Sequence, residues 1–189
     1  TLIIEPPDEQ IDSLEKLEYY PGVFSWLSRI ASETDFELVM VTNQDGLGTS
    51  SFPEETFWPA QNKILKTFEN EGVKFSKIFI DRSLPHENKP TRKPGVGMLT
   101  EFFSNQYDLG NSFVIGDRLT DIEMARNLGT KGILLNNGSL SKKIEEKALQ
   151  NFCSFTTVSW KEIYTFLVSP SRKASVVRTT RETDINIEI

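Results

Sequence analysis

The sequence predicts an α/β protein built on a parallel sheet. Apolar runs with β-branched residues alternate along the chain with segments of helical periodicity, and this alternation indicates βα units. The length of 189 residues fits one domain of ordinary size plus an appendage. Since ligands of open parallel sheets bind outside the carboxyl ends of the strands, functional residues are expected directly after the apolar runs.

The first half of the chain predicts two helices, each followed by a strand. Pro21-Gly22 precedes a helix with apolar residues on one face, namely Phe24, Leu27 and Ile30. The apolar run 36–42 then predicts a buried strand. After a loop rich in Gly and Ser, a second helix is expected from Pro53 to about Gly72, and a strand over 75–80.

The second half continues this alternation after a polar loop that ends at Pro94. The segment after Pro94 predicts a helix with four apolar residues, Met98, Leu99, Phe102 and Phe103. The remaining expected elements, in order, are a strand over 112–116, a helix to about 128, a strand over 132–135, a charged helix from 141 and a helix over 160–167.

Charge and composition exclude several classes of function. The chain has 21 basic and 27 acidic residues, a net charge of −6 and no basic block, so nucleic acid is not an expected partner. No apolar run reaches the length of a membrane span, and residues 1–7 do not resemble a signal peptide. We therefore expect no membrane association and a cytoplasmic location. The single Cys153 and single His86 exclude intrachain disulfides and the usual Cys/His zinc clusters.

The most informative stretch runs from Phe113 to Asp121. Its apolar residues lead to Gly116 and Asp117, and a second carboxylate, Asp121, follows four residues later. An aspartate at the carboxyl end of a parallel strand suits a hard cation such as Mg²⁺, which keeps substrate phosphate in its coordination shell. The alternative is a plain strand-to-helix turn in which Asp121 interacts with the helix dipole.

Two further segments carry groups suited to phosphate. Thr42 and Asn43 end an apolar strand, where a hydroxyl and the following backbone N–H groups can hold a phosphate oxygen. Arg92-Lys93-Pro94 closes the next long loop, and the Lys93 cation can neutralise a phosphoryl group. Taken separately, a Thr after a strand and a solvated Lys are both common features.

The order of these groups resembles the haloacid dehalogenase superfamily of phosphatases: a strand-terminal Thr, a loop Lys and a Gly-Asp-x-x-x-Asp turn. Within it, the chain is similar to the histidinol-phosphate phosphatase domain of a bifunctional enzyme of histidine biosynthesis. The matching segments are 1–3, 5–7, 21–23, 41–49, 51–53, 92–94 and 114–118. The resemblance implies a three-layer, Rossmann-like parallel sheet and Mg²⁺-dependent hydrolysis of a small substrate, histidinol phosphate.

The resemblance also implies roles for particular residues. It assigns Asp117 to the metal and Asp121 to the support of Lys93 or of a metal-bound water. Phosphoryl oxygens would be held by Thr42, Asn43 and Lys93. The substrate would also meet Arg92 and Glu5, the latter near the amino group or imidazole of histidinol, although an exposed loop carboxylate is the simpler interpretation of Glu5.

The end of the chain resembles a different enzyme. The segment 177–185 looks like the opening strand of imidazoleglycerol-phosphate dehydratase. We therefore expect a phosphatase domain over 1–168, and over 169–189 a linker and the first strand of a dehydratase domain of the same polypeptide. The alternative is a C-terminal edge strand added to the same sheet.

Two departures from the resembled pattern matter. Thr1 matches the Thr of an Asp-x-Asp-Gly-Thr turn, so the nucleophilic aspartate, the acid/base aspartate and most of the first strand would precede this chain, which is then expected to be inactive. The loop 81–91, where the pattern has a Cys/His zinc cluster, offers no Cys and one His, so no zinc is expected. Alternative functions are a heptose bisphosphate phosphatase and a non-catalytic folding or assembly module.

Overall fold

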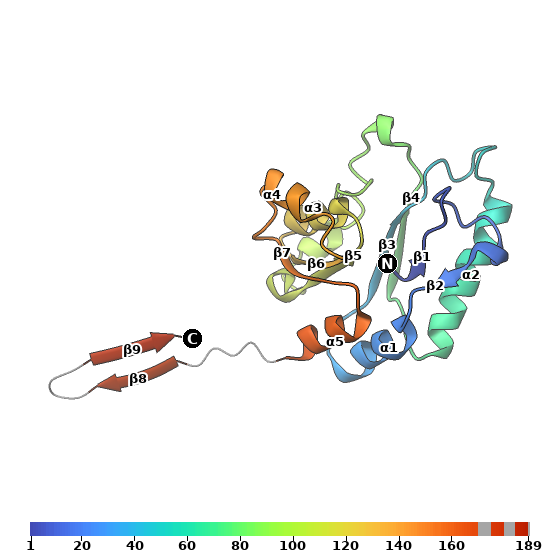
Figure 1. Ribbon diagram of the computed structural model, residues 1–189. Helices are drawn as coiled ribbons and strands as arrows, with labels where there is room; N and C mark the ends of the chain where they lie inside the picture. Colours follow the sequence, from blue (N-terminus) through green and yellow to red (C-terminus); the bar gives the residue numbers. More distant parts are fainter. Residues whose placement is uncertain (170–174, 180–183, 189) are drawn as a thin grey trace.

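The computed structural model describes residues 1–169, 175–179 and 184–188 (Figure 1). The strands are β1 (Ile3–Ile4), β2 (Glu18–Tyr19), β3 (Val39–Asn43), β4 (Lys77–Asp81), β5 (Phe113–Gly116), β6 (Lys131–Leu135), β7 (Cys153–Thr157), β8 (Ser175–Thr179) and β9 (Asp184–Glu188). The α-helices are α1 (Val23–Glu33), α2 (Glu54–Asn70), α3 (Leu119–Leu128), α4 (Ser141–Glu146) and α5 (Trp160–Val168). Short 3₁₀ turns cover Leu14–Lys16, Pro85–Glu87, Thr100–Phe103 and Leu109–Asn111.

The strands near the site are parallel, as predicted. β3 pairs with β4, with Asn43 opposite Asp81, and β5, β6 and β7 form a second parallel group. The N-terminal strands β1 and β2 form a small antiparallel pair. None of the helices in the described residues is long and apolar enough to cross a membrane.

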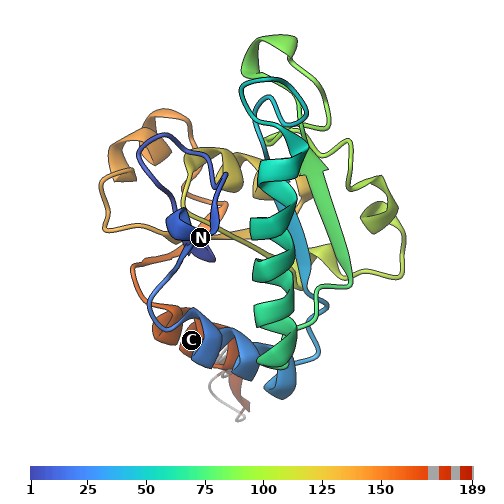
Figure 2. The same cartoon turned by 90° about the vertical axis from the view of Figure 1, so that its right-hand side faces the viewer.

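Alternation of side chains along the strands produces three layers. Met40 and Ile115 pack with one core cluster, which contains buried residues of α1, α2 and α5. Their neighbours Val41 and Val114 pack instead with Leu99, Phe102, Met124 and Leu128, residues of α3 and of the segment before β5. Because successive strand side chains point to opposite faces, helices cover both faces of the strands, and the predicted α/β architecture is confirmed. Figure 2 shows α2 lying lengthwise against β3 and β4.

The segment after Pro94 differs from its prediction. The expected helix is replaced by turns and one 3₁₀ turn, Thr100–Phe103. The backbone there is held close to the preceding loop, since Gly97 N–H donates to the Pro90 carbonyl at 2.8 Å. Leu99 and Phe102 are buried as expected, but Phe103 is 50% exposed. Tertiary contacts of the backbone therefore override the helical spacing of the apolar residues.

Three strands were not predicted from the sequence. β7 has the sequence Cys-Ser-Phe-Thr-Thr, whose polar content conceals it, and β1 and β2 have only two residues each. β7 is nevertheless fixed by its pairing with β6.

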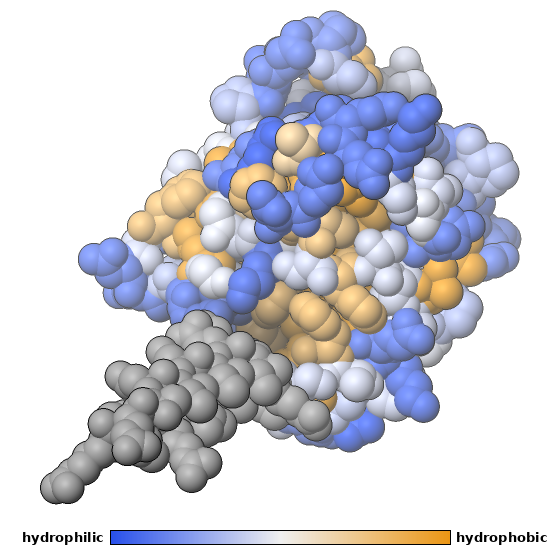
Figure 3. All heavy atoms as spheres, turned by 60° about the vertical axis from the view of Figure 1, so that its left-hand side comes forward, coloured by the Kyte–Doolittle hydropathy of each residue, from blue (hydrophilic) through white to orange (hydrophobic). Residues whose placement is uncertain are grey.

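The face of the molecule shown in Figure 3 carries apolar residues gathered between polar ones.

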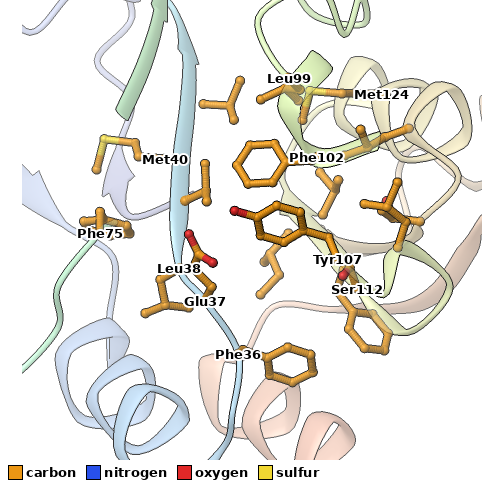
Figure 4. Close-up of a pocket in the computed structure, with 18 of the residues that line it drawn as sticks. Phe36, Glu37, Leu38, Met40, Phe75, Leu99, Phe102, Tyr107, Ser112 and Met124 are labelled. Carbon is orange, nitrogen blue, oxygen red and sulfur yellow. The ribbon is translucent and has the colours of Figure 1, made fainter. Parts of the chain in front are cut away.

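A cavity of about 760 Å³ lies between β3 and β5. Among the described residues β3 pairs only with β4, and β5 pairs with β6 but not with β3. The cavity is therefore bordered by one strand from each parallel group. Figure 4 shows Leu38 and Met40 on the β3 side, with Phe102 and Tyr107 on the opposite side. Thr1 and Leu2 also line it.

The C-terminal strands β8 and β9 form their own antiparallel pair, with Val177 opposite Asn186. They do not extend the sheet of β5, β6 and β7, so the alternative of an added edge strand is not observed. Residues 170–174 of the expected linker lie outside the described residues. The assignment of this segment to a dehydratase domain stays a prediction.

Candidate phosphate and metal site

The turn after β5 carries two carboxylates, the buried Asp121 and the partly exposed Asp117. Gly116 ends the strand, and Asp121 in the first turn of α3 accepts a hydrogen bond from the Arg118 backbone N–H at 3.0 Å. A Cβ on Gly116 would lie 2.2 Å from Asp121 Cγ, so only glycine lets the carboxylate pack against this backbone. Asp121 is 3% exposed. Asp121 thus caps the start of α3, as the alternative interpretation held, but this contact uses only its Oδ2 atom.

The second oxygen of Asp121 pairs with Lys93. Lys93 Nζ lies 2.8 Å from Asp121 Oδ1, and the two side chains are 16% and 4% exposed. Little water can screen the attraction between these two side chains, and removal of either would leave the other buried without its partner. The ammonium of Lys93 is therefore kept at the edge where β3 and β5 end, and it is not a solvated surface Lys.

The end of β3 holds the backbone of Lys93. The Asn43 side chain accepts from Lys93 N–H at 3.0 Å and donates to the Lys93 carbonyl at 3.3 Å. Thr42 precedes it, and its hydroxyl oxygen accepts from Gln44 Nε2 at 2.8 Å. A continuous series of contacts thus joins the end of β3, through Lys93 and Asp121, to the end of β5.

Asp117 lies next to the first residue of the chain. Its Oδ1 accepts a hydrogen bond from the Thr1 hydroxyl. Its side chain is 37% exposed.

The donor chemistry at Asp117 fits a hard cation in part. Asp117 offers carboxylate oxygens beside the Thr1 hydroxyl oxygen, and Mg²⁺ prefers oxygen ligands. Within the ranges that the structure covers, however, no group of three or more His, Cys, Asp or Glu side chains is placed to hold a metal ion. Asp117 alone would therefore not complete the shell of a magnesium ion, which would need further oxygens, for example from substrate or water.

Arg92 and Glu5 each have a charged partner in the structure. Arg92 makes a two-pronged contact with the Asp45 carboxylate and donates to the Ser83 carbonyl at 2.7 Å. Glu5 accepts twice from Arg118, at 2.6 and 2.7 Å, and this contact raises the pKa of Arg118 above its ordinary value. Their predicted contacts with substrate stay predictions.

Two residues that sequence analysis did not select belong to this site. Asp45 holds Arg92, and Asp81, 5% exposed, ends β4 opposite Asn43. The position of Asp81 was a usable signal, because it is a carboxylate directly after an apolar strand. Asp45 gave no such signal within a polar, Gly-rich loop.

Comparison with known proteins identifies the family. Residues 90–154, which contain Lys93, Asp117 and Asp121, match the HAD-hydrolase-like family model. Over its full length the chain is 55% identical to the histidine biosynthesis bifunctional protein HisB of Bacteroides fragilis and 53% identical to that of Spirosoma linguale. The chain belongs to the haloacid dehalogenase-like hydrolases. It spans about half of these curated relatives, 50% and 52% of their lengths.

Solved structures show that this haloacid dehalogenase-like chain shares its fold with phosphatases. One is the D,D-heptose 1,7-bisphosphate phosphatase from B. bronchiseptica, complexed with magnesium and phosphate, with a TM-score of 0.74 and 22% identity over 89% of this chain and 93% of that one. Another is a putative HAD-like phosphatase from Mesorhizobium loti, with a TM-score of 0.59 and 24% identity over 71% and 67% of the two chains. At these identities the likeness concerns the fold alone.

Proposed function

We propose that this chain is the phosphatase part of a bifunctional protein of histidine biosynthesis and that the whole protein hydrolyses histidinol phosphate. The observation that carries the proposal is the buried Lys93–Asp121 pair at the junction of β3 and β5. Asn43, the residue after Thr42, holds the Lys93 backbone, and in the proposed site the three side chains together would bind the phosphoryl group. Identity of 53–55% over the full chain to proteins named HisB supports the substrate.

The cavity between β3 and β5 supports a further part of this proposal. Two strand edges that face a common apolar space leave N–H and C=O groups available for pairing. The contacts from Asn43 through Lys93 to Asp121 bring the carboxyl ends of both strands to the same edge. We infer that one extended strand, continuous with Thr1 in the longer protein, fills the cavity and ends in the Asp-x-Asp turn beside Asp117.

The proposed reaction follows from that placement. A carboxylate oxygen of the first aspartate of the turn forms a bond to phosphorus, and the bond from phosphorus to the histidinol oxygen breaks. The second aspartate gives its proton to the departing oxygen, then takes one from the water that hydrolyses the aspartyl-phosphate. Thr42, Asn43 and Lys93 hold the phosphoryl oxygens, and Lys93 stabilises the charge that develops on them.

Magnesium and the remaining partners complete the proposal. Asp117 would hold Mg²⁺, which supplies positive charge beside the phosphoryl group. Asp121 supports Lys93, while Arg92 and Glu5 lie toward the substrate. We propose no zinc in the 81–91 loop, a cytoplasmic location, and a dehydratase domain that begins after residue 168 in the same polypeptide.

A heptose bisphosphate phosphatase is the second candidate, favoured by the shared fold with the B. bronchiseptica enzyme. The whole protein should release phosphate from histidinol phosphate with a kcat/KM at least about 100-fold above that for heptose 1,7-bisphosphate, because a site that pairs with particular polar groups discriminates strongly against substrates that lack them. Steady-state phosphate release with both substrates measures this ratio. Preference for the heptose compound would replace the proposed substrate, and no release from either would favour the non-catalytic module.

A further inference from the structure

Three consecutive residues before Pro94 each contact the end of β3, the end of β4 or the loop that follows β3. Thr91 donates its hydroxyl to Asp81 Oδ2 at 2.5 Å. Arg92 contacts Asp45, and the Lys93 backbone pairs with the Asn43 side chain. Each residue of the segment 91–93 thus has its own partner, at a strand end for Thr91 and Lys93 and in the loop after β3 for Arg92.

Asp81 is the most buried of these partners. Its Oδ1 accepts from the Ser83 backbone N–H at 2.9 Å and from the Ser83 hydroxyl, while its Oδ2 accepts from Thr91. Its own carbonyl accepts from Gln44 N–H at 2.7 Å. Burial raises the pKa of Asp81, but the Ser83 and Thr91 hydrogen bonds outweigh it and hold that pKa below its usual value. A buried carboxylate satisfied in this way resists displacement.

The loop beyond these contacts has little freedom to compensate for their loss. Gly95 N–H donates to the Arg92 carbonyl at 2.6 Å, and Gly97 N–H donates to the Pro90 carbonyl at 2.8 Å. A Cβ on Gly95 would lie 2.2 Å from the Pro90 carbonyl oxygen. The backbone on both sides of Lys93 is therefore packed against itself, and its position depends on where the segment 91–93 is attached.

We propose that Asp81 is a positioning residue that acts through Thr91 to place the Lys93 ammonium. Asp81 reaches Lys93 by two routes: its hydrogen bond to Thr91, two residues before Lys93, and its pairing in the strand register with Asn43, which holds the Lys93 backbone. The step from placement to phosphate binding rests on the proposed function.

The test compares three variants in the full-length protein: Asp81→Asn, Thr91→Val and Thr91→Ser. Asp108→Asn is the matched control, because Asp108 likewise accepts from a nearby loop N–H, Asn111 at 3.2 Å, but in a different turn. Amide hydrogen exchange over residues 83–95 should become about 10- to 100-fold faster in Asp81→Asn and Thr91→Val, the effect of losing a hydrogen bond to a charged group. Thr91→Ser and Asp108→Asn should leave it unchanged.

A second readout links the loop to Lys93. The dissociation constant for inorganic phosphate should rise about 10-fold or more in Asp81→Asn and in Thr91→Val. In Thr91→Ser, which keeps the hydroxyl, it should equal that of the unchanged protein. Unchanged exchange in both variants would overturn the proposal, and so would an acceleration of equal size in α1 and α5, which indicates general loss of stability. Because exchange is measured without substrate, a failure of the proposed phosphatase activity would leave the exchange result interpretable. If Asp81→Asn does not fold, Thr91→Val and Thr91→Ser decide the question alone.

Discussion

Replacement of Lys93 by Met in the full-length protein should lower kcat/KM for phosphate release about 10²- to 10³-fold, the usual effect of removing one group that stabilises charge in the transition state. The same change should lower the free energy of unfolding by about 3–5 kcal/mol, because it leaves a buried carboxylate without its partner. Asp121 has an almost fully buried side chain, 4% exposed, 2.8 Å from Lys93. Denaturant unfolding and steady-state kinetics measure the two effects separately.

A double variant and a matched control separate these effects. Lys93→Met with Asp121→Leu removes both charges and should regain much of the lost stability while activity stays low, since replacing both members of a buried pair is often neutral. Lys66→Met removes the pair with Glu69 at 2.8 Å, whose two side chains are 66% and 61% exposed, and should change stability by about 1 kcal/mol or less. A Lys93→Met variant as stable as Lys66→Met would contradict the burial of the pair, and full activity would remove Lys93 from the site.

Replacement of Gly116 by Ala should destabilise the protein by about 1–3 kcal/mol, because the added methyl overlaps a packed neighbour. That neighbour is the Asp121 carboxylate, whose Cγ lies 2.2 Å from the position of the new Cβ. Moving this carboxylate also disturbs Lys93, so activity should fall along with stability. Gly110→Ala is the control, since its Cβ would meet only Asp108 Oδ1 at 3.6 Å. Equal stability of the two variants, measured by denaturant unfolding, would show that the turn after β5 has more space than the structure gives it.

Sequence reasoning predicted the central architecture because strongly apolar strands dominate it. β3, β4, β5 and β6 lie within one to three residues of their expected ends, since each is a short apolar run between polar segments. The helix expected after Pro94 failed because apolar spacing does not reveal backbone contacts such as Gly97 to Pro90. β7 was missed because pairing with β6, and not its own composition, makes it a strand.

The site shows the same division between local pattern and long-range contact. Asp117 and Lys93 were selected because their residue types and positions after strands suit metal and phosphate. The family resemblance implied that Asp121, 28 residues from Lys93, supports this lysine, and the structure contains that pair. The contact of Thr91 with Asp81 appears only when the strand ends meet in space. Contacts between loops leave no periodic pattern in a sequence, so the role of Asp45 is visible only in the structure. Asp81 could have been selected, because it is a carboxylate at the end of an apolar strand.

Phosphate release from histidinol phosphate, measured for residues 1–189 and for the longer polypeptide with the upstream strand and Asp-x-Asp turn, tests the account most directly. Both forms should bind phosphate through Lys93, but binding ground state and transition state alike does not accelerate the reaction. The longer form should therefore release phosphate only with Mg²⁺, and residues 1–189 should release none. Comparable turnover by residues 1–189 would place the nucleophile within them and contradict the proposed occupant of the cavity between β3 and β5.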